Sequence, residues 1–457
     1  MKVKNLFAIA LASIALFACS NDDEPTGGQD VSGKDTWAAF SIQLPKTVTR
    51  SVDDDGTNAT TDETEVKCVA IYVKQSNGHM ATSGIKYLSD YSDDTNGPTY
   101  KAKIAIPVKT GEADVWAVVN PSQSMHDLIM GFPANEAFHT AFSATVEDMA
   151  GGLSYANQTG ITSSGFVMTN YATKHVTLVQ VNTEEEAVNT KQPNDAKNHF
   201  TIKVERAVAK VAVISTKANV ADLNGIPQQG AFTKIKYYAA QVNKDMYMAR
   251  WTDATEQPGG ANIVTPGNDS NGTTVFGTNV LKATPLDINP LGTEKKDLKS
   301  IYLLENSMKN PLQTNATHVV IEAVWTPKTL YMADGTTKAT GYATGDDFWF
   351  YNSKYYKELP QELVAGSGNP EAGKGDDYKW TGGKCYYWVY LYDKYTTTKF
   401  YDVVRNTVYN VNISSIKAPG SNVPTPPPGP ISEQTYVTAT VNIAPWTLAD
   451  MDNVDLQ

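Results

Sequence analysis

The first residue whose chemistry the sequence indicates is Cys19, a thiol that follows a short apolar segment. Residues 6–18 form an apolar run after two lysines; the run has the length of a signal-peptide core and is well short of the roughly 20 residues that a spanning helix needs. It ends in LFAC at 16–19, which resembles a lipobox, although Phe17 is larger than the usual residue there. An acidic patch at 20–24 resembles a surface-export tag. The sequence therefore predicts a signal peptide at 1–18 and lipidation of Cys19; an ordinary secretory signal is the alternative.

Arg50 and Ser51 form a second candidate site, in this case for proteolysis. They lie in a polar, Asp-rich stretch that separates one amphipathic strand pattern from the rest of the chain. Arginines in exposed loops of this kind are the positions that trypsin-like proteases cut most readily. The sequence therefore predicts maturation by cleavage between Arg50 and Ser51, with residues 19–50 as a lipidated propeptide.

Motifs of enzymes and of metal sites are incomplete in this chain. The stretch at 368–375 nearly spells a phosphate loop but ends in Gly375, where a magnesium-binding Ser or Thr is required. The six histidines lack the paired spacing of zinc ligands, and DDDG at 53–56 has no distal Glu to complete a calcium loop. No nucleophile elbow or Cys–His pair occurs in a suitable context. We therefore predict a protein that is not an enzyme and that uses no cofactor or metal.

The composition favours an all-β protein and argues against nucleic acid as a partner. The formal net charge is −11, whereas binding to phosphates requires clustered Lys and Arg. Val, Thr, Tyr, Asn and Gly recur along the chain, and these residues are typical of strands and turns. Cys68 and Cys385 each lie within an apolar strand pattern, so two separate buried thiols are favoured over one disulfide.

Alternating apolar patterns predict the strands that must position these candidate sites. The predicted strands cover residues 36–45, 66–73, 100–108, 115–120, 176–181, 200–215, 232–242, 301–304, 318–325, 386–392, 403–416 and 437–443, and short helices are predicted at 135–142 and 146–149. Turn-forming and acidic residues at 182–198 predict a junction near residue 196, between domains at 51–196 and 197–420. Five prolines between 424 and 430 predict a stiff spacer within a terminal segment at 421–457.

The two ends of the chain carry the same strand pattern, closed by proline in each case. One face of the first strand carries Ala38, Phe40, Ile42 and Leu44, and one face of the last carries Val437, Ala439, Val441 and Ile443. If cleavage after Arg50 removed the first strand, the body would expose an apolar groove with unpaired edges. The last strand of another copy would then fill this groove, with Trp446 and Leu448 extending the contact, which is strand addition between subunits.

Several segments, taken together and in order, carry a resemblance to a known family. They are LFAC at 16–19, Thr49-Arg50, VERAVAKV at 204–211, YLLEN at 302–306, GGKCYY at 382–387, VVRNTVY at 403–409, and the tail from PW at 445–446 to VDL at 454–456. In this set the chain resembles the fimbrillins of Bacteroidales, structural subunits of type V pili, and especially the shaft subunit of the minor fimbrium. The resemblance implies two transthyretin-like β-sandwich domains with a C-terminal donor strand, an outer-membrane lipoprotein precursor, and donor-strand polymerisation into an adhesive cell-surface fimbrium.

The partners that this resemblance implies are other copies of the chain, related pilus subunits, the outer membrane through the precursor's lipid, and ligands on host or bacterial surfaces. Two non-enzymatic alternatives stay open. One is a tip or accessory adhesin, which would receive a donor strand and have little need to give one. The other is a monomeric surface lipoprotein that binds glycans through the aromatic residues at 349–351, 380 and 386–388, most of which are more typical of a core.

Overall fold

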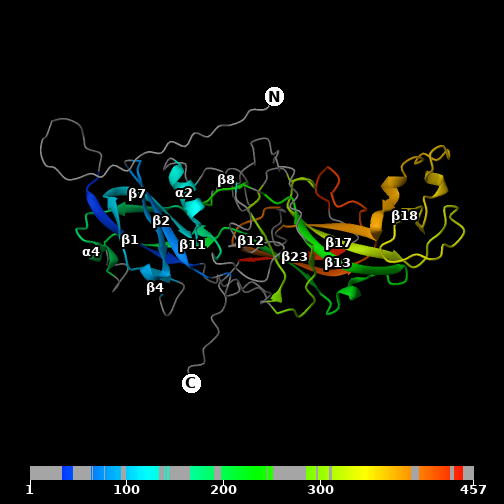
Figure 1. The fold of residues 1–457 in the computed structure, drawn as a ribbon, viewed down its shortest axis with the longest axis horizontal. Coiled ribbons are helices and arrows are strands. Elements are labelled where there is room, and N and C mark those ends of the chain that lie inside the picture. The colour runs from blue at the N-terminus through cyan, green and yellow to red at the C-terminus, as the bar shows by residue number, and fades with distance from the viewer. Residues whose placement is uncertain are drawn as a thin grey trace, which may run out of the picture.

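The computed structural model is an all-β molecule, as the alternating patterns predicted (Figure 1). It describes residues 33–44, 63, 65–76, 78–93, 99–132, 138, 142–143, 165–189, 197–243, 245–250, 285–294, 297–307, 311–392, 401–432 and 437–445. Helices in this part of the chain are short: α2 (Gln123–Gly131), α4 (Glu184–Val188) and the 3₁₀ turns η1 (Leu88–Asp90), η2 (Val220–Leu223), η4 (Gln361–Leu363), η5 (Gly375–Tyr378) and η6 (Thr381–Gly383). The helices predicted at 135–142 and 146–149 lie almost entirely outside the described residues.

The first half of the molecule is built around β1 (Asp35–Gln43). Its other strands are β2 (Cys68–Gln75), β3 (Met80–Tyr87), β4 (Tyr91–Asp93), β5 (Thr99–Ala102), β6 (Ile106–Lys109), β7 (Gly111–Val119), β9 (Met168–Asn170), β10 (Lys174–Leu178) and β11 (His199–Arg206). Within the described residues they are joined in the order β3-β2-β7-β9-β11-β1-β5-β4, with β10 beside β7 and β6 beside β1. β1 therefore lies inside the sheet, with neighbours along both of its edges.

The second half contains two four-stranded sheets among its described residues. One has the order β16 (Ile301–Leu303), β12 (Ala209–Ser215), β22 (Thr407–Ile416), β23 (Val437–Pro445), and the other β15 (Leu286–Asp287), β13 (Gly230–Ala240), β17 (His318–Pro327), β21 (Lys384–Tyr390). Side chains from both sheets belong to the same buried hydrophobic cluster, as in a β-sandwich. A small sheet of β19 (Lys354–Tyr356), β18 (Phe348–Tyr351) and β20 (Lys379–Trp380) lies at the far end of this half (Figure 1).

The first strand of each half occupies the same kind of place. β1 runs parallel to β11, the last strand of the first half, and antiparallel to β5 and β6. Likewise β12 runs parallel to β22 and antiparallel to β16. Parallel pairs are uncommon in sheets made by short connections, because parallel strands need a long crossover. In both halves the crossover is a long stretch of the half, so the first strand of each half returns to pair with a strand near the end of that half, β11 or β22.

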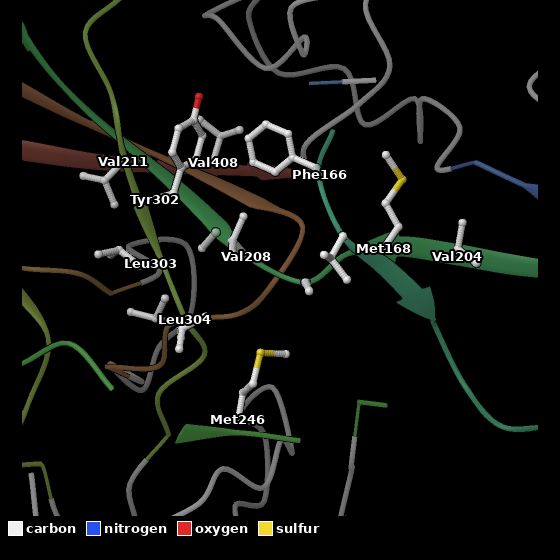
Figure 2. Packing of buried hydrophobic residues seen from close by; sticks show 14 of the residues in the cluster. Phe166, Met168, Val204, Val208, Val211, Met246, Tyr302, Leu303, Leu304 and Val408 are labelled. Carbon is white, nitrogen blue, oxygen red and sulfur yellow. The ribbon is translucent and has the colours of Figure 1, made fainter. Parts of the chain in front are cut away.

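The chain passes from the first half to the second between β11 and β12, at Ala207 and Val208. The sequence predicted one continuous strand at 200–215 and a junction near residue 196, but β11 pairs with β1 and β9 of the first half, so the change-over falls after Arg206. A continuous hydrophobic cluster spans this junction (Figure 2). In it the rings of Phe166 and Tyr302 meet edge to face, with centroids 5.0 Å apart. β8 (Phe142–Ser143) and β14 (Asp245–Met246) also pair across it.

Candidate assembly site

The predicted removable strand, β1, is held along both edges by backbone pairing. It is paired with β11 from Ala39, opposite His199, to Gln43, opposite Lys203. On its other edge it pairs with β6 from Asp35 to Ala38 and with β5 at Ile42 and Gln43. Removing β1 would therefore leave two rows of unpaired backbone groups, one on β11 and one on β5 and β6.

The side chains of β1 are buried on both faces of the sheet. Those predicted to face the groove, Ala38, Phe40, Ile42 and Leu44, are at most 5% exposed. On the opposite face Ala39 and Ser41 are buried as well. The ring of Phe40 stacks on that of Phe200 of β11, with centroids 5.8 Å apart. The alternation in the sequence therefore identified a strand with two buried faces, and the place it fills is apolar.

Polar groups fix the register of β1 within this place. Asn198, in the left-handed conformation just before β11, donates from Nδ2 to Trp37 O at 2.9 Å, and its own carbonyl accepts from Ala39 N. Ser41 Oγ lies 2.7 Å from His199 Nε2 and accepts from the amide of Ala102. Burial lowers the pKa of His199, so its ring is neutral at neutral pH. A strand that takes the place of β1 has to satisfy these hydrogen-bonding groups and also pack against the apolar side chains around them.

The predicted donor strand, β23, lies at the edge of the second half and pairs antiparallel with β22 of the same chain. Val437 and Val441 are buried there, whereas Ala439 and Ile443 are only partly covered. Thr438 and Thr440, on the opposite face, are exposed. β23 is therefore folded back on its own subunit.

The proline-rich segment is not a free spacer either. Ser421 exchanges both backbone hydrogen bonds with Tyr386 of β21, and Pro424 O accepts from Trp388 Nε1 at 2.7 Å. Further on, Gly429 O accepts from Gln313 N. A proline keeps its own carbonyl as an acceptor, and the Trp388 side chain uses that of Pro424 here.

The remaining predicted assembly residues, Cys19, Arg50, Ser51, Trp446 and Leu448, lie outside the described residues. Within the described ranges, no helix is both long and apolar enough to cross a membrane.

The other candidate groups take structural places. In the stretch that resembles a phosphate loop, Lys374 Nζ is paired with Glu371 Oε2 at 3.0 Å. Across the described part of the chain no three or more His, Cys, Asp or Glu side chains are grouped so that they could hold a metal ion. Cys68 and Cys385 are free thiols, as favoured from the sequence, and burial raises the pKa of Cys385.

The proposed glycan platform is divided by the fold. Its residues 386–388 are buried in β21, and of the others Phe350 meets Trp380 edge to face in the small β18–β20 sheet. The sequence had marked most of these residues as more typical of a core, and for 386–388 this is confirmed.

Buried charges at the junction of the two halves were missed from the sequence. Glu63 Oε1 pairs with Lys210 Nζ at 2.9 Å and accepts from Tyr302 OH at 2.7 Å, and all three side chains are nearly inaccessible to solvent. Two arginines then cross the junction in opposite directions. Arg206 Nη1, from β11, donates to Asn406 Oδ1 at 3.1 Å, and Arg405 Nη1, from the second half, donates to Thr169 Oγ1 of β9 at 3.1 Å.

A signal for these pairs exists in the sequence. Charged residues at 205, 206 and 210 interrupt an otherwise apolar strand pattern, and charges are almost never fully buried without partners. Burial lowers the pKa of Arg206 to about 10, so its guanidinium stays charged at neutral pH. We call Arg206 and Arg405 the arginine staples.

Comparisons with known proteins agree with this architecture. Residues 38–221 match the family model of the major fimbrial subunit protein (FimA), and residues 378–452 match that of the C-terminal part of fimbrillin, the major fimbrial subunit protein type IV. Two sequences of the minor fimbrium subunit Mfa1 of Porphyromonas gingivalis are each 23% identical to the chain, over 99% of both chains.

Solved fimbrial structures are similar at lower identity. A fimbrilin of Porphyromonas gingivalis is 17% identical with a TM-score of 0.45, and the alignment covers 90% of this chain and 98% of that one. The tip fimbrial protein Mfa3 of the same species is 12% identical with a TM-score of 0.40, over 90% of this chain and all of that one. From the two family models and the full-length relatives we conclude that the chain belongs to the fimbrillins, the non-enzymatic structural subunits of fimbriae.

Proposed function

We propose that the chain is exported as a lipoprotein anchored through Cys19, is cleaved between Arg50 and Ser51, and polymerises when the C-terminal strand of one subunit takes the place of β1 in the next. The observation that carries this proposal is the position of β1. It is a central strand with two buried faces, yet Arg50 lies in the connection between it and the next described residue of the body. One cut there separates the strand from everything it pairs with.

Comparison of the two strand sites supports a transfer of β23. On its own subunit β23 has one neighbour, β22, and two of its four predicted donor residues are only partly covered. The place of β1 has neighbours on both edges and buries all four corresponding positions. A strand that moves from the first site to the second gains backbone hydrogen bonds and apolar burial, each larger side chain contributing roughly 1.5–3 kcal/mol when it is fully buried.

The pairing also sets the direction of the donor. A strand in the place of β1 runs parallel to β11 and antiparallel to β5 and β6. If Val437, Ala439, Val441 and Ile443 replace Ala38, Phe40, Ile42 and Leu44 in that order, Val441 lies between Ile202 and Tyr100, the two residues opposite Ile42. Trp446 and Leu448 then continue past the end of the β1 pairing.

A photo-crosslinking residue at position 100 tests this arrangement, because Tyr100 pairs with whatever strand occupies the place of β1. In the precursor we expect an intramolecular crosslink to residues 35–44. In assembled fibres we expect a crosslinked dimer in which position 100 is joined to residues 437–448 of another subunit. Fibres whose crosslink stays within one chain, or reaches a different segment, would refute the donor-strand proposal.

The same probe placed at Lys236 serves as the control. Lys236 lies on β13 of the second half, opposite Asp287 and Glu322, and takes no part in pairing with β1. Its crosslinks should be the same in precursor and fibre. Adhesion to host or bacterial surfaces is part of the proposed role, and the assembled fibre is the form in which to measure it.

A further inference from the structure

The connection between β22 and β23 crosses the outer face of the other sheet in this half. We call residues 420–431 of this connection the strap. It begins at Gly420, where a β-carbon would lie 2.3 Å from Tyr386 O, so only glycine fits this approach. Trp380 Nε1 donates to Gly420 O at 3.1 Å, and Tyr387 OH donates to Ala418 O at 2.8 Å. The start of the strap is thus held by the close contact at Gly420 and by hydrogen bonds from the side chains of Trp380 and Tyr387.

The surface beneath the strap is aromatic. Successive side chains of β21 point to opposite faces of its sheet. Cys385, Tyr387 and Val389 belong to the main core, whereas Tyr386, Trp388 and Tyr390 belong to a second, separate cluster with Val320 of β17. Tyr238 and Ile431, the last residue of the strap, pack against this second cluster. We call this surface the aromatic face.

Contacts hold the strap along most of its length, some on the aromatic face and some on the segments beside it. Asn422 Nδ2 donates to the backbone carbonyls of Asp377 and Lys379 at 3.1 and 3.0 Å. Trp388 Nε1 donates to Pro424 O, and Pro426 is buried although the residues on either side of it are exposed. Pro430 forms a bridge with Leu312. An extended proline-rich segment on an aromatic surface, with a tryptophan N–H bound to a proline-segment carbonyl, is the arrangement by which proline-rich peptides are recognised.

We propose that the aromatic face is an intramolecular site for a proline-rich segment, that its occupant is the strap of the same chain, and that this contact latches β23 onto its own subunit. Because the strap is the chain between β22 and β23, its docking fixes the point from which β23 starts. The prolines stiffen the connection. Docking of the strap on the aromatic face therefore favours the pairing of β23 with β22. Release of the strap is then the step that frees β23 to act between subunits. This last consequence rests on the proposed donor-strand function, but the latch itself does not.

Hydrogen exchange on the purified precursor tests the latch without any polymerisation. Trp388→Phe keeps a ring on the aromatic face and removes the N–H that binds Pro424. We expect the amides of β23 to exchange roughly three- to tenfold faster, the factor that the loss of one hydrogen bond represents. Asn422→Ala, which acts from the strap side, should have the same effect. Trp116→Phe, the same substitution in β7 of the first half, should leave β23 unchanged. Unaltered exchange of β23 in both Trp388→Phe and Asn422→Ala would overturn the latch.

A reversible lock tests the consequence for assembly. Leu312 and Pro430 form an antiparallel bridge, in which α-carbons lie about 4.5–5.5 Å apart, a separation that a disulfide can span. We expect the Leu312→Cys, Pro430→Cys chain, once trimmed after Arg50, to stay monomeric when oxidised and to polymerise after reduction. Each single cysteine variant serves as a control. Trp388→Phe should polymerise faster than the unaltered chain.

The possible results separate the two proposals. Polymerisation of the oxidised double variant at the rate of the reduced one overturns the role of the latch in assembly. An unaltered chain that never polymerises after trimming, together with faster exchange of β23 in Trp388→Phe, refutes the donor-strand function and supports the latch. Slower assembly of Trp388→Phe than of the unaltered chain would also overturn the latch, because a released strap should favour exchange of strands.

Discussion

At the scale of single residues, the buried ion pair of Lys210 and Glu63 is the feature with a large cost of desolvation. A buried charge is tolerated only with close partners, and here the carboxylate has both an ammonium and a phenol within hydrogen-bond distance. Glu63 also accepts from Arg206 Nε through its backbone carbonyl. Glu63 thus holds the start of the first-half body against the first strand of the second half.

Lys210→Met should lower the free energy of unfolding by about 3–5 kcal/mol, because it leaves a carboxylate buried without its counter-charge. The matched control is Lys299→Met, which removes an equally short pair with Asp287 that is exposed on both sides. For the control we expect a loss within about 1 kcal/mol. Denaturant titration of both variants measures the difference. Similar losses in the two would contradict the role of burial.

His318 gives stability a defined dependence on pH. Its ring is fully buried in β17, and burial lowers its pKa from 6.5 to about 4, with Nδ1 on Ala316 O at 2.8 Å. As pH falls through 6.5 the unfolded chain takes up this proton, whereas the native chain resists until about 4. The contribution of His318 to the free energy of unfolding is therefore complete above pH 6.5. Between pH 6.5 and 4 it falls by about 3 kcal/mol.

His318→Phe should remove this part of the pH dependence, since phenylalanine cannot titrate. We expect the difference in unfolding free energy between the unaltered chain and the variant to be constant from pH 7 to 9. It should fall steadily from pH 6.5 to 4. Denaturant titrations at each pH measure it, and a difference that stays constant across the whole range would show that the ring takes up its proton as readily in the native state as in the unfolded chain.

At the scale of elements, the period of two in the sequence identified the strands well and their partners poorly. β1, β2, β7, β17, β21 and β23 lie where alternation predicted them, because each buries at least one face. Alternation carries no information on which strands pair, so the parallel contact of β1 with β11 and the return of β23 to β22 could not be read from it. Composition likewise predicted a stiff proline segment but not its docking, which depends on the aromatic face of β21.

α2 shows the same limit for helices. Ser122 caps it by accepting from Met125 N at 3.2 Å, which is a recognisable start signal. Only Met125 and Ile129 are buried along its length, so the apolar periodicity that would have revealed it is weak. The residues proposed for the assembly site came from a pattern that repeats at both chain ends, and their role stays a prediction; the present pairing of the two strands could not be read from that pattern.

Val441→Asp should detach β23 from β22 and also prevent fibres, because the carboxylate has to be desolvated in either place. Val441 is 4% exposed on its own subunit, whereas neighbouring Asn442 is partly exposed and, in the proposed register, takes the place of Gln43, which is also partly exposed. Asn442→Asp is therefore the control, and we expect it to assemble normally. Electron microscopy after trimming, together with hydrogen exchange on the monomer, gives both readouts. Normal fibres of Val441→Asp would exclude this strand as the donor.

At the scale of the whole molecule, the proposed function makes the state of the first half depend on one peptide bond, between Arg50 and Ser51. Arg50→Ala should accumulate as a longer chain that keeps β1 in its central place, and it should not assemble. Arg50→Lys, which a protease of broader basic specificity still cuts, distinguishes an arginine-specific protease from a general one. N-terminal sequencing of fibre subunits checks the position. Subunits that start upstream of Phe40 would show that β1 is retained.

In the proposed function, lipidation at the other end of the propeptide, at Cys19, sets where the chain is delivered. Cys19→Ala should abolish labelling by a fatty-acid probe and leave the precursor poorly exposed on the cell surface. Cys68→Ala, which removes a thiol within the folded body, should label normally. Full labelling of Cys19→Ala would mean that the apolar run at 6–18 is an ordinary secretory signal.

The arginine staples have a consequence for how a fibre bears load. A pull along the fibre has to pass through every subunit, from one half to the other, across a junction whose backbone continuity at Ala207 and Val208 is a single strand. Arg206 reaches forward to Asn406 and Arg405 reaches back to Thr169, so the two guanidinium groups oppose sliding of the halves in both senses. The shared hydrophobic cluster resists their separation. We therefore expect the junction within each subunit to add to the tensile stiffness of a fibre.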